Sequence, residues 1–501
     1  MTWALSLLWS VFVPRALGPT GLGELTIAYA ATGVVSVLIS LGIGTLMVKE
    51  IARDRTSAPW LVGTALIVRA GFVVPAVVAV ALYMHFARFG TEQMVVIWIA
   101  TGSMVLSLFT GPFQAAFQGI ERMEYLAYAD VLTKAVVSVA GIALVFMGFG
   151  VVPVIAVALA MGAVALALSV WWSRGKFSVD WRLNPDHVRF LVVDSLPYWT
   201  TGLVLTFYMW IDSVMLSVMV PAKVVGYYAV PTKIFSTLLF VPVIFATAWL
   251  PRLSASFRES RAALVATGRP AVELVLALSA PVAAGTVLVA GPLVRDIYGG
   301  AFAPSVTVLV VLAYSLVPTY LNIMVNQVLV ASNRQLAWTK VMVAAAVVNP
   351  ILNLVLITYF QSRYNNGAIG AAVSLLVTEL GMAVAGWALL PRGVLGRRSI
   401  SRLARALVAT GGMTVVVWFL RKYGLLIEVG AGAATFGALA LALRLVAAEE
   451  LAMVHPLLGR LPARALAQVD ERPECAYGGR ECQWQTGESR RPCETCRQRW
   501  V

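Results

Sequence analysis

The sequence predicts an all-α polytopic membrane protein with about fourteen transmembrane helices. Two features of its composition support this fold class: 60% of the 501 residues are apolar, and only 12% are charged. A soluble globular protein carries about twice that share of charged residues, so the surface of this chain must face lipid. The third observation is the length of the apolar runs, because a helix needs about 20 apolar residues to cross a bilayer.

The apolar runs follow one another from residue 2 to residue 446, and the first is short for a membrane span. They lie at about residues 2–16, 24–48, 60–86, 94–117, 126–149, 151–172, 197–218, 229–249, 270–292, 303–327, 336–359, 367–390, 402–420 and 424–446. Backbone amide groups find no water in the hydrocarbon core, so each run must form a helix. The alternation of apolar and polar residues that is typical of membrane β-strands is absent.

The spacing of these runs divides the chain into five segments. They are a first six-helix lobe at 1–172, a cytoplasmic connector at 173–196, a second six-helix lobe at 197–390, two extra transmembrane helices at 391–446 and a cytoplasmic tail at 447–501. Within the connector, Asn184-Pro185-Asp186 indicates a helix start, because a capping residue precedes Pro and an acid. An amphipathic helix on the inner leaflet and a plain linker both fit this segment.

The distribution of Lys and Arg predicts which side of the membrane each connector faces. Nineteen of these residues lie in or beside the even-numbered connectors, and eight in or beside the odd-numbered ones. Cytoplasmic loops carry the excess of Lys and Arg in membrane proteins. We therefore expect the even connectors and both termini in the cytoplasm, and we interpret the net charge of +14 as topological rather than as a sign of nucleic-acid binding.

Two pairs of similar segments indicate an internal duplication. They pair residues 19–55 with 221–258, where Gly23 aligns with Gly226, and residues 115–132 with 327–342, where Arg122 aligns with Arg334. The matches come in the same order in both halves, and both halves begin on the same side of the membrane. We therefore expect a parallel repeat of six plus six helices about an axis along the membrane normal.

Several short motifs follow one another with an order and spacing that resemble those of one transporter family. They are Arg15-Ala16-Leu17-Gly18-Pro19, Gly21-Leu22-Gly23, Leu41-Gly42-Ile43-Gly44, Lys49-Glu50-Ile51-Ala52-Arg53, Gln118-Gly119 with Glu121-Arg122, Asp212 with Gly226-Tyr227-Tyr228-Ala229, Lys233-Ile234, Pro251-Arg252-Leu253-Ser254, Ala331-Ser332-Asn333-Arg334, Asn349 to Asn353 and Gly367 to Ala372. This set resembles the Wzx-type polysaccharide flippases, which are lipid-linked oligosaccharide translocases of the multidrug/oligosaccharidyl-lipid/polysaccharide exporter superfamily. The resemblance covers residues 1–446, and the Cys-bearing tail has no counterpart in it.

The resemblance implies a two-lobed helical bundle around a central cavity. Such a protein would move a polyprenyl-(pyro)phosphate-linked glycan across the cytoplasmic membrane by alternating access, for surface polysaccharide biosynthesis. Its partners would be the lipid-linked glycan, membrane lipids and a glycan polymerase or glycosyltransferase. A multidrug or organic-cation antiporter of the same superfamily and a membrane scaffold for glycan-assembly enzymes are the alternatives.

Ionisable residues inside the spans are the candidate functional residues, because they are costly in lipid. Arg69 lies about 14 Å into the third span at about 1.5 Å per residue, which places it near the midplane. A cation that lines the cavity and a structural partner for another helix both explain it. Lys134 follows Asp130 by one turn in the fifth span, so a self-neutralised pair and a substrate-binding cation are both open.

Three more charged residues lie nearer the outer ends of their spans. Arg15 ends the first span, where substrate binding and snorkelling to the interface explain it almost equally well. Asp212 in the seventh span and Lys233 in the eighth are candidates for a pair between helices; Lys233 is also a candidate for binding substrate, and Asp212 for ion coupling through a bound proton or cation. The lone acids Glu273 and Glu379 are expected near the cytoplasmic ends of their spans, without a special role.

No set of residues in the sequence indicates an enzyme or a required cofactor. The three His residues are scattered, and neither an HExxH motif nor a GxxxxGK[ST] phosphate-binding loop occurs. The tail holds Cys475, Cys482, Cys493 and Cys496, and the last two form the Cys-x2-Cys half of a typical structural zinc site. A structural zinc ion and a flexible tail with free thiols are both open.

Overall fold

The computed structural model describes residues 2–445, in which every regular element is a helix. The α-helices are α1 (Thr2–Ser40), α2 (Ile43–Arg53), α3 (Ala58–Ala87), α4 (Thr91–Gly119), α5 (Met123–Phe146), α6 (Val151–Ser173), α7 (Pro185–Val193), α8 (Leu196–Met219), α9 (Ala222–Leu238), α10 (Phe240–Glu259), α11 (Arg261–Tyr298), α12 (Ser305–Ala331), α13 (Gln335–Tyr364), α14 (Gly367–Leu389), α15 (Arg397–Leu420) and α16 (Leu425–Ala442). Two short 3-10 helices are η1 (Arg55–Ser57) and η2 (Gly300–Phe302). The all-α prediction is confirmed, and the predicted tail with its four cysteines lies outside the described residues.

Thirteen helical segments in residues 2–445 are long and apolar enough to cross a membrane. The count of about fourteen stays a prediction, because this count takes α1 as one segment although α1 consists of two helices, which lie where the first two runs are predicted. Gly18 lies inside α1 with φ 70° and ψ −179°. Glycine adopts this positive φ without steric cost, so the chain kinks there and continues as a helix on both sides.

Both matched segments of the predicted repeat share local geometry. After α4 and after α12, the chain turns through one left-handed residue, Glu121 with φ 62° and Asn333 with φ 55°. The next backbone N–H groups, of Arg122 and Arg334, donate to carbonyl oxygens five residues earlier at 2.8 and 2.7 Å. This is the Schellman form of a helix C-cap. The second predicted span of each half also breaks partway along: residues 24–48 are divided between α1 and α2, and residues 229–249 between α9 and α10. These shared features support the duplication.

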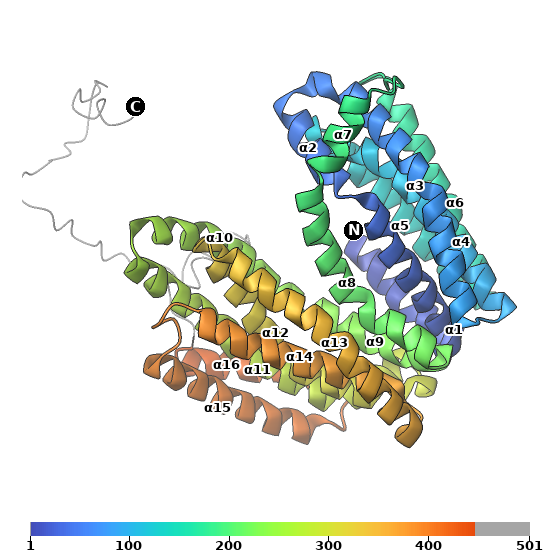
Figure 1. Cartoon of the computed structure of the whole chain (residues 1–501). Coiled ribbons are helices and arrows are strands. Elements are labelled where there is room, and N and C mark those ends of the chain that lie inside the picture. The colour runs from blue at the N-terminus through green and yellow to red at the C-terminus, as the bar shows by residue number, and fades with distance from the viewer. Residues whose placement is uncertain (1, 446–501) are drawn as a thin grey trace, which may run out of the picture. The chain divides into compact units, whose positions relative to one another are not determined.

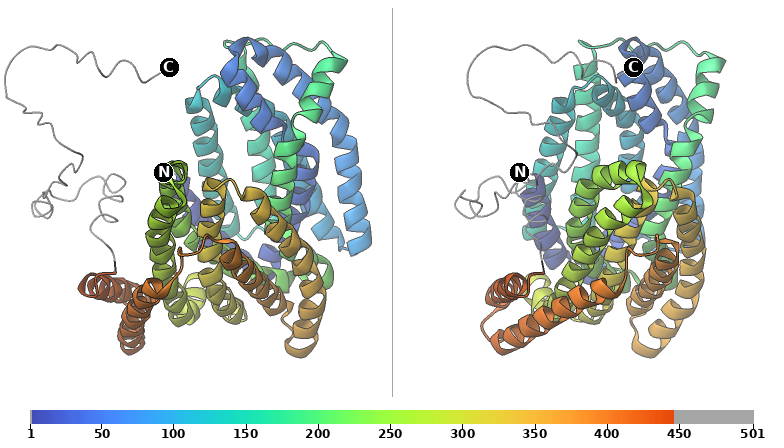
Figure 2. Two further views of the ribbon diagram at one scale, coloured as in Figure 1. Left: turned by 60° about the vertical axis from the view of Figure 1, so that its left-hand side comes forward. Right: turned by 90° about the vertical axis from the view of Figure 1, so that its left-hand side faces the viewer.

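Helices α1 to α7 form one group and helices α8 to α16 a second, which we call the N-terminal bundle and the C-terminal bundle (Figure 1). In the N-terminal bundle, α4 packs against α1, α2, α3 and α6; in the C-terminal bundle, α12 packs against α9, α10, α11 and α14. Helix α1 also contacts α8, α9 and α11, so the bundles meet along α1. The orange and red helices α15 and α16 lie at the margin of the C-terminal bundle (Figure 2). The predicted boundaries at residues 172, 196 and 390 remain predictions.

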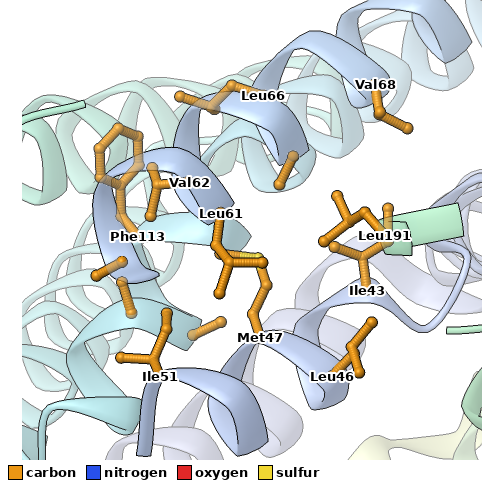
Figure 3. Packing of buried hydrophobic residues seen from close by; sticks show 14 of the residues in the cluster. Ile43, Leu46, Met47, Ile51, Leu61, Val62, Leu66, Val68, Phe113 and Leu191 are labelled. Carbon is orange, nitrogen blue, oxygen red and sulfur yellow. The ribbon is translucent and has the colours of Figure 1, made fainter. Parts of the chain in front are cut away.

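The connector between the bundles is held against the N-terminal bundle. Its helix α7 begins at the predicted place, where the Asn184 side chain accepts a hydrogen bond from the backbone N–H of Asp186 at 2.9 Å. Leu191 of α7 is fully buried in one core with Ile43 of α2 and Leu61 of α3 (Figure 3). The connector therefore contains a helix, as one of the two interpretations predicted, and the apolar side of this helix faces protein.

Buried polar contacts fasten α15 to α11. Glu273 of α11 accepts a hydrogen bond from the Ser399 hydroxyl at 2.5 Å and lies 3.6 Å from the Arg402 guanidinium. The Arg402 and Glu273 side chains are only 10% and 8% exposed. One turn before Glu273, Arg269 donates to the carbonyl oxygen of Gly393 at 2.6 Å. The expectation that Glu273 needs no special role is wrong, because Glu273 forms a buried ion pair between two helices.

Candidate functional site

A cavity of about 320 Å³ lies where the N-terminal bundle meets α9. Its polar and aromatic lining consists of Ser6 and Trp9 of α1, Thr133, Lys134 and Ser138 of α5, and Lys233 of α9. The residues of α5 are one turn apart or adjacent, so they share one face of that helix. The cavity thus brings together two of the predicted substrate-binding residues, Lys134 and Lys233, from opposite bundles.

Lys134 forms the ion pair that its spacing predicts. Its amino group lies 2.9 Å from a carboxylate oxygen of Asp130, and the two side chains are 45% and 50% exposed. An exposed pair of this kind is worth only about 0.2–1 kcal/mol. A doubly charged phosphate in the cavity can therefore compete with Asp130 for the amino group.

Lys233 supplies the uncompensated charge of the cavity. Its side chain is exposed, and no carboxylate in residues 2–445 forms an ion pair with it. The expected pair with Asp212 does not form, because Asp212 is bonded to other partners. A cation without a counter-ion at the junction of two membrane bundles attracts an anion and repels a cation.

Trp9 is a lining residue that the sequence analysis did not single out. Its indole Nε1 is buried without a hydrogen-bond partner, and a Cβ atom added at Gly141 would lie 3.3 Å from that nitrogen. An aromatic ring beside hydroxyl groups and two amines suits a sugar that is linked to a phosphate. No charge marks Trp9, and the only available signal was its place three residues after Ser6 on one helix face.

Arg69 lies apart from this cavity, in the interior of the N-terminal bundle. Its side chain is 6% exposed and donates from Nη1 to the backbone oxygen of Leu108. Gly111 of α4 makes room for the guanidinium, and the Nε atom is buried without a partner. Arg69 therefore joins α3 to α4, and its predicted role in substrate binding stays a prediction.

Arg15 connects the two bundles at the end of a helix. Its Nη1 atom donates to the carbonyl oxygens of Asp296 and Ile297 at 2.7 and 3.2 Å. These carbonyl groups end α11, where a positive charge is favoured by the helix dipole. Substrate binding by Arg15 also stays a prediction.

Asp212 lies in a buried polar network of the C-terminal bundle. Its carboxylate accepts hydrogen bonds from the Tyr228 hydroxyl at 2.8 Å and the Asn353 side-chain amide at 2.7 Å. The same amide donates to Asn349 at 2.9 Å, and the Asn353 carbonyl oxygen is buried without a partner. Both of these partners of Asp212 are neutral, so no basic side chain in the network compensates the charge of the carboxylate.

Glu379 forms a second buried carboxylate near Asp212. It accepts hydrogen bonds from the Tyr208 hydroxyl at 2.6 Å and the Asn322 side-chain amide at 2.7 Å. Tyr208 precedes Asp212 by one helical turn, so α8 carries both Asp212 and the tyrosine that donates to Glu379. Glu379 lies in the middle of α14 and is 5% exposed, so its expected place near the end of its span is wrong.

The sequence matches the family model described as polysaccharide biosynthesis protein over residues 1–257. It is also similar to a probable flippase, AglR of Haloferax volcanii, with 25% identity over 461 residues, which are 87% of this chain and 91% of that protein. The resemblance inferred from the motifs is confirmed by these matches.

Two solved structures share the fold. The lipid II flippase MurJ in an inward closed conformation aligns with a TM-score of 0.68 and 13% identity, over 88% of this chain and 97% of its own. An inward-facing multidrug resistance transporter of the MATE family, from the MOP superfamily, aligns with a TM-score of 0.61 and 15% identity, over 81% and 95%. These proteins are flippases or transporters, which confirms the prediction that the chain is not an enzyme.

Proposed function

Because the chain belongs to the polysaccharide biosynthesis protein family, we propose that it flips a polyprenyl-(pyro)phosphate-linked glycan across the cytoplasmic membrane, from the inner to the outer leaflet. The chain is a multi-pass membrane protein with the fold of flippase-like transporters of the MOP superfamily. One observation carries the proposed substrate class: Lys134 and Lys233 line one cavity from opposite bundles.

The charge of the cavity supports an anionic substrate over an organic cation. Asp130 balances Lys134, so Lys233 leaves the site with one net positive charge. A hydrogen bond to a charged group is worth about 1.5–3 kcal/mol, which corresponds to a factor of about 10 to 100 in affinity. A pyrophosphate offers enough oxygens to contact both lysines, and the sugar would then lie beside Trp9 and the hydroxyl groups of α1 and α5.

We propose Asp212, with Glu379 beside it, as the site of ion coupling. A buried carboxylate with neutral partners is stabilised when it takes up a proton or a small cation. Tyr228, which donates to Asp212, lies on the same helix as Lys233, five residues earlier. A change in the charge of Asp212 can therefore alter the position of α9 and of the cavity lysine that α9 carries.

Binding to the purified protein tests the substrate class. We expect a polyprenyl pyrophosphate to bind more tightly than a lipophilic organic cation of similar chain length. The variant Lys233→Glu should weaken binding of the lipid pyrophosphate by at least about tenfold and should tighten binding of the organic cation. The matched control is Lys223→Glu, the same charge change on an exposed residue of α9 outside this cavity.

Two outcomes would redirect the proposal. Tighter binding of the organic cation by the wild-type protein would favour a multidrug antiporter. Binding of neither ligand by a folded protein would favour a scaffold that holds glycan-assembly enzymes.

A further inference from the structure

The two bundles touch backbone to backbone where α1 and α9 cross. A Cβ atom added at Gly23 would lie 1.8 Å from the carbonyl oxygen of Ala222. A Cβ atom added at Gly226 would lie 1.9 Å from the carbonyl oxygen of Pro19. Both distances are far shorter than any real contact, and the obstructing atoms belong to the backbone. The helices therefore approach this closely only because both residues are glycine.

The contact is reciprocal, and it follows the internal repeat. Pro19 precedes Gly23 by four residues, and Ala222 precedes Gly226 by four. Each pair therefore lies on one helix face, in the first turns after the kink of α1 and in the first turns of α9. Gly23 and Gly226 are the residues that the repeat aligns. The carbonyl group of each half thus meets the glycine of the other half, which makes the two glycines equivalent in their packing.

Other contacts join the bundles on the same side of the membrane, at the ends that carry the odd-numbered connectors. Arg15 donates to the end of α11, and the hydroxyl groups of Tyr83 in α3 and Ser217 in α8 lie 2.5 Å apart. Figure 1 shows α9 beside the bend of α1, whereas α2 and α10, which lead to even-numbered connectors, are well separated. The structure is thus a state in which the odd-connector side is closed.

We propose that Gly23 and Gly226 form the gate that closes the odd-connector side of the transporter. This inference rests on the proposed alternating access, in which that side must open once per cycle. Contacts between Cα–H groups and carbonyl oxygens are weak, so helices packed this way can separate without breaking an ion pair. The helices can also pack together again without ordering a side chain, because neither glycine has one at the contact.

A substitution by Ala at either glycine should hold the gate open. The added methyl group has no room in the closed state and ample room once the helices part. We expect Gly23→Ala and Gly226→Ala to raise the ratio of open to closed molecules by about tenfold or more, the size of effect that overpacking produces. Because the contact is reciprocal, the two variants should behave alike.

The matched controls are Gly71→Ala in α3 and Gly291→Ala in α11. Both glycines lie in membrane helices, and an added Cβ atom meets nothing within 4 Å at either one. These variants carry the same change in helix propensity, so they separate its effect from that of the gate.

The measurement is a distance distribution between two spin labels on the odd-connector side, one on each bundle. We would label Phe149→Cys and Arg363→Cys, both exposed, in the full chain with its four native cysteines replaced by Ser. The gate variants should enrich the longer distances, and the controls should not. Unchanged distances in folded Gly23→Ala and Gly226→Ala would overturn the gate.

A cross-link covers the case in which the gate variants fail to fold. A short bis-methanethiosulfonate linker forms a reducible disulfide with each of Tyr83→Cys and Ser217→Cys, while the distance labels are attached to non-canonical residues at 149 and 363 by bonds that reduction does not cleave. The cross-link should remove the longer distances and stop transfer of lipid, and reduction should restore both. Longer distances that persist after complete cross-linking would overturn the proposal. The distance measurements need no substrate, so they can succeed even if the proposed substrate is wrong.

Discussion

The two cavity lysines differ in their neighbours, and that difference predicts how each contributes to binding. Lys233 has no carboxylate partner in the described chain, whereas Lys134 shares its charge with Asp130. Lys233 should therefore dominate the attraction of an anion, and Asp130 should weaken it. The hydroxyl groups of Thr133 and Ser138 and the ring of Trp9 would add orientation rather than charge.

Removing the charge of Asp130 should tighten binding of the lipid pyrophosphate. The exposed pair with Lys134 is worth about 0.2–1 kcal/mol, so Asp130→Asn should lower the Kd by a factor of up to about five. Titration of the purified protein measures this change, with Asp194→Asn, an exposed acid of the connector, as the control. Weaker binding in Asp130→Asn would show that the carboxylate itself contacts the substrate.

Asp212→Asn should uncouple transfer from an ion gradient. The amide keeps the size of the carboxylate and can still bond to Tyr228 and Asn353, but it binds neither a proton nor a cation well. We expect transfer in proteoliposomes to lose its response to an imposed sodium or pH gradient, while binding of the lipid pyrophosphate stays within about twofold. A variant that responds to the gradient as the wild type does would exclude Asp212 as the coupling residue.

At the scale of residues, the sequence predicted side-chain pairs within one helix and missed the pairs that form between two helices. The spacing of Asp130 and Lys134 was sufficient, because four residues make one turn. The partners of Asp212 and Glu379 come from other helices, and only the packing of α8, α9, α12, α13 and α14 brings them together. Trp9 carries no charge, so no cost of burial marked it in the sequence.

At the scale of single elements, a buried ion pair between Glu273 and Arg402 helps to hold α15 against α11. Breaking such a pair by removing one partner costs about 3–5 kcal/mol, because the remaining charge loses its counter-ion. Glu273→Gln should therefore lower the midpoint of thermal unfolding in detergent far more than Glu259→Gln, which changes an exposed acid at the end of α10.

A double variant separates the charge effect from packing. Glu273→Gln combined with Arg402→Met removes both charges and keeps most of the volume, so stability should return toward that of the wild type. Equal losses in Glu273→Gln and Glu259→Gln would contradict the role of the ion pair in holding α15.

Helix positions were predictable from the apolar runs, whereas helix junctions were not. A run of apolar residues fixes where a span must lie, but it does not show how the chain turns between two runs. The kink at Gly18 needed the three-dimensional path of the chain, because glycine favours kinks and ends of helices equally. The connector helix was predictable from Asn184 and Pro185, and its packing partner was not.

At the scale of the whole molecule, the positive-inside rule predicts the orientation. We expect Glu259→Cys, beside an even connector, to react with a membrane-impermeant thiol reagent only after cells are opened. Arg363→Cys, beside an odd connector, should react in intact cells. Both variants would be made in the chain without native cysteines, and the reverse pattern would place the connectors rich in Lys and Arg outside.

The duplication was the most informative whole-molecule feature of the sequence. Aligning Gly23 with Gly226 and Arg122 with Arg334 anticipated pairs of residues that adopt matching geometry. The sequence did not show that the two halves meet through these same glycines. That contact depends on how the bundles are placed, which periodicity along one helix does not encode.

Transfer of a polyprenyl-pyrophosphate-linked glycan between leaflets of a liposome tests the central claim most directly. Wild-type protein should transfer this lipid rapidly, and the double variant Lys134→Gln/Lys233→Gln should lose at least about tenfold of that rate, while Lys223→Gln keeps it. Absence of transfer by folded wild-type protein, with and without an ion gradient, would contradict the account, as would an unchanged rate in the double variant.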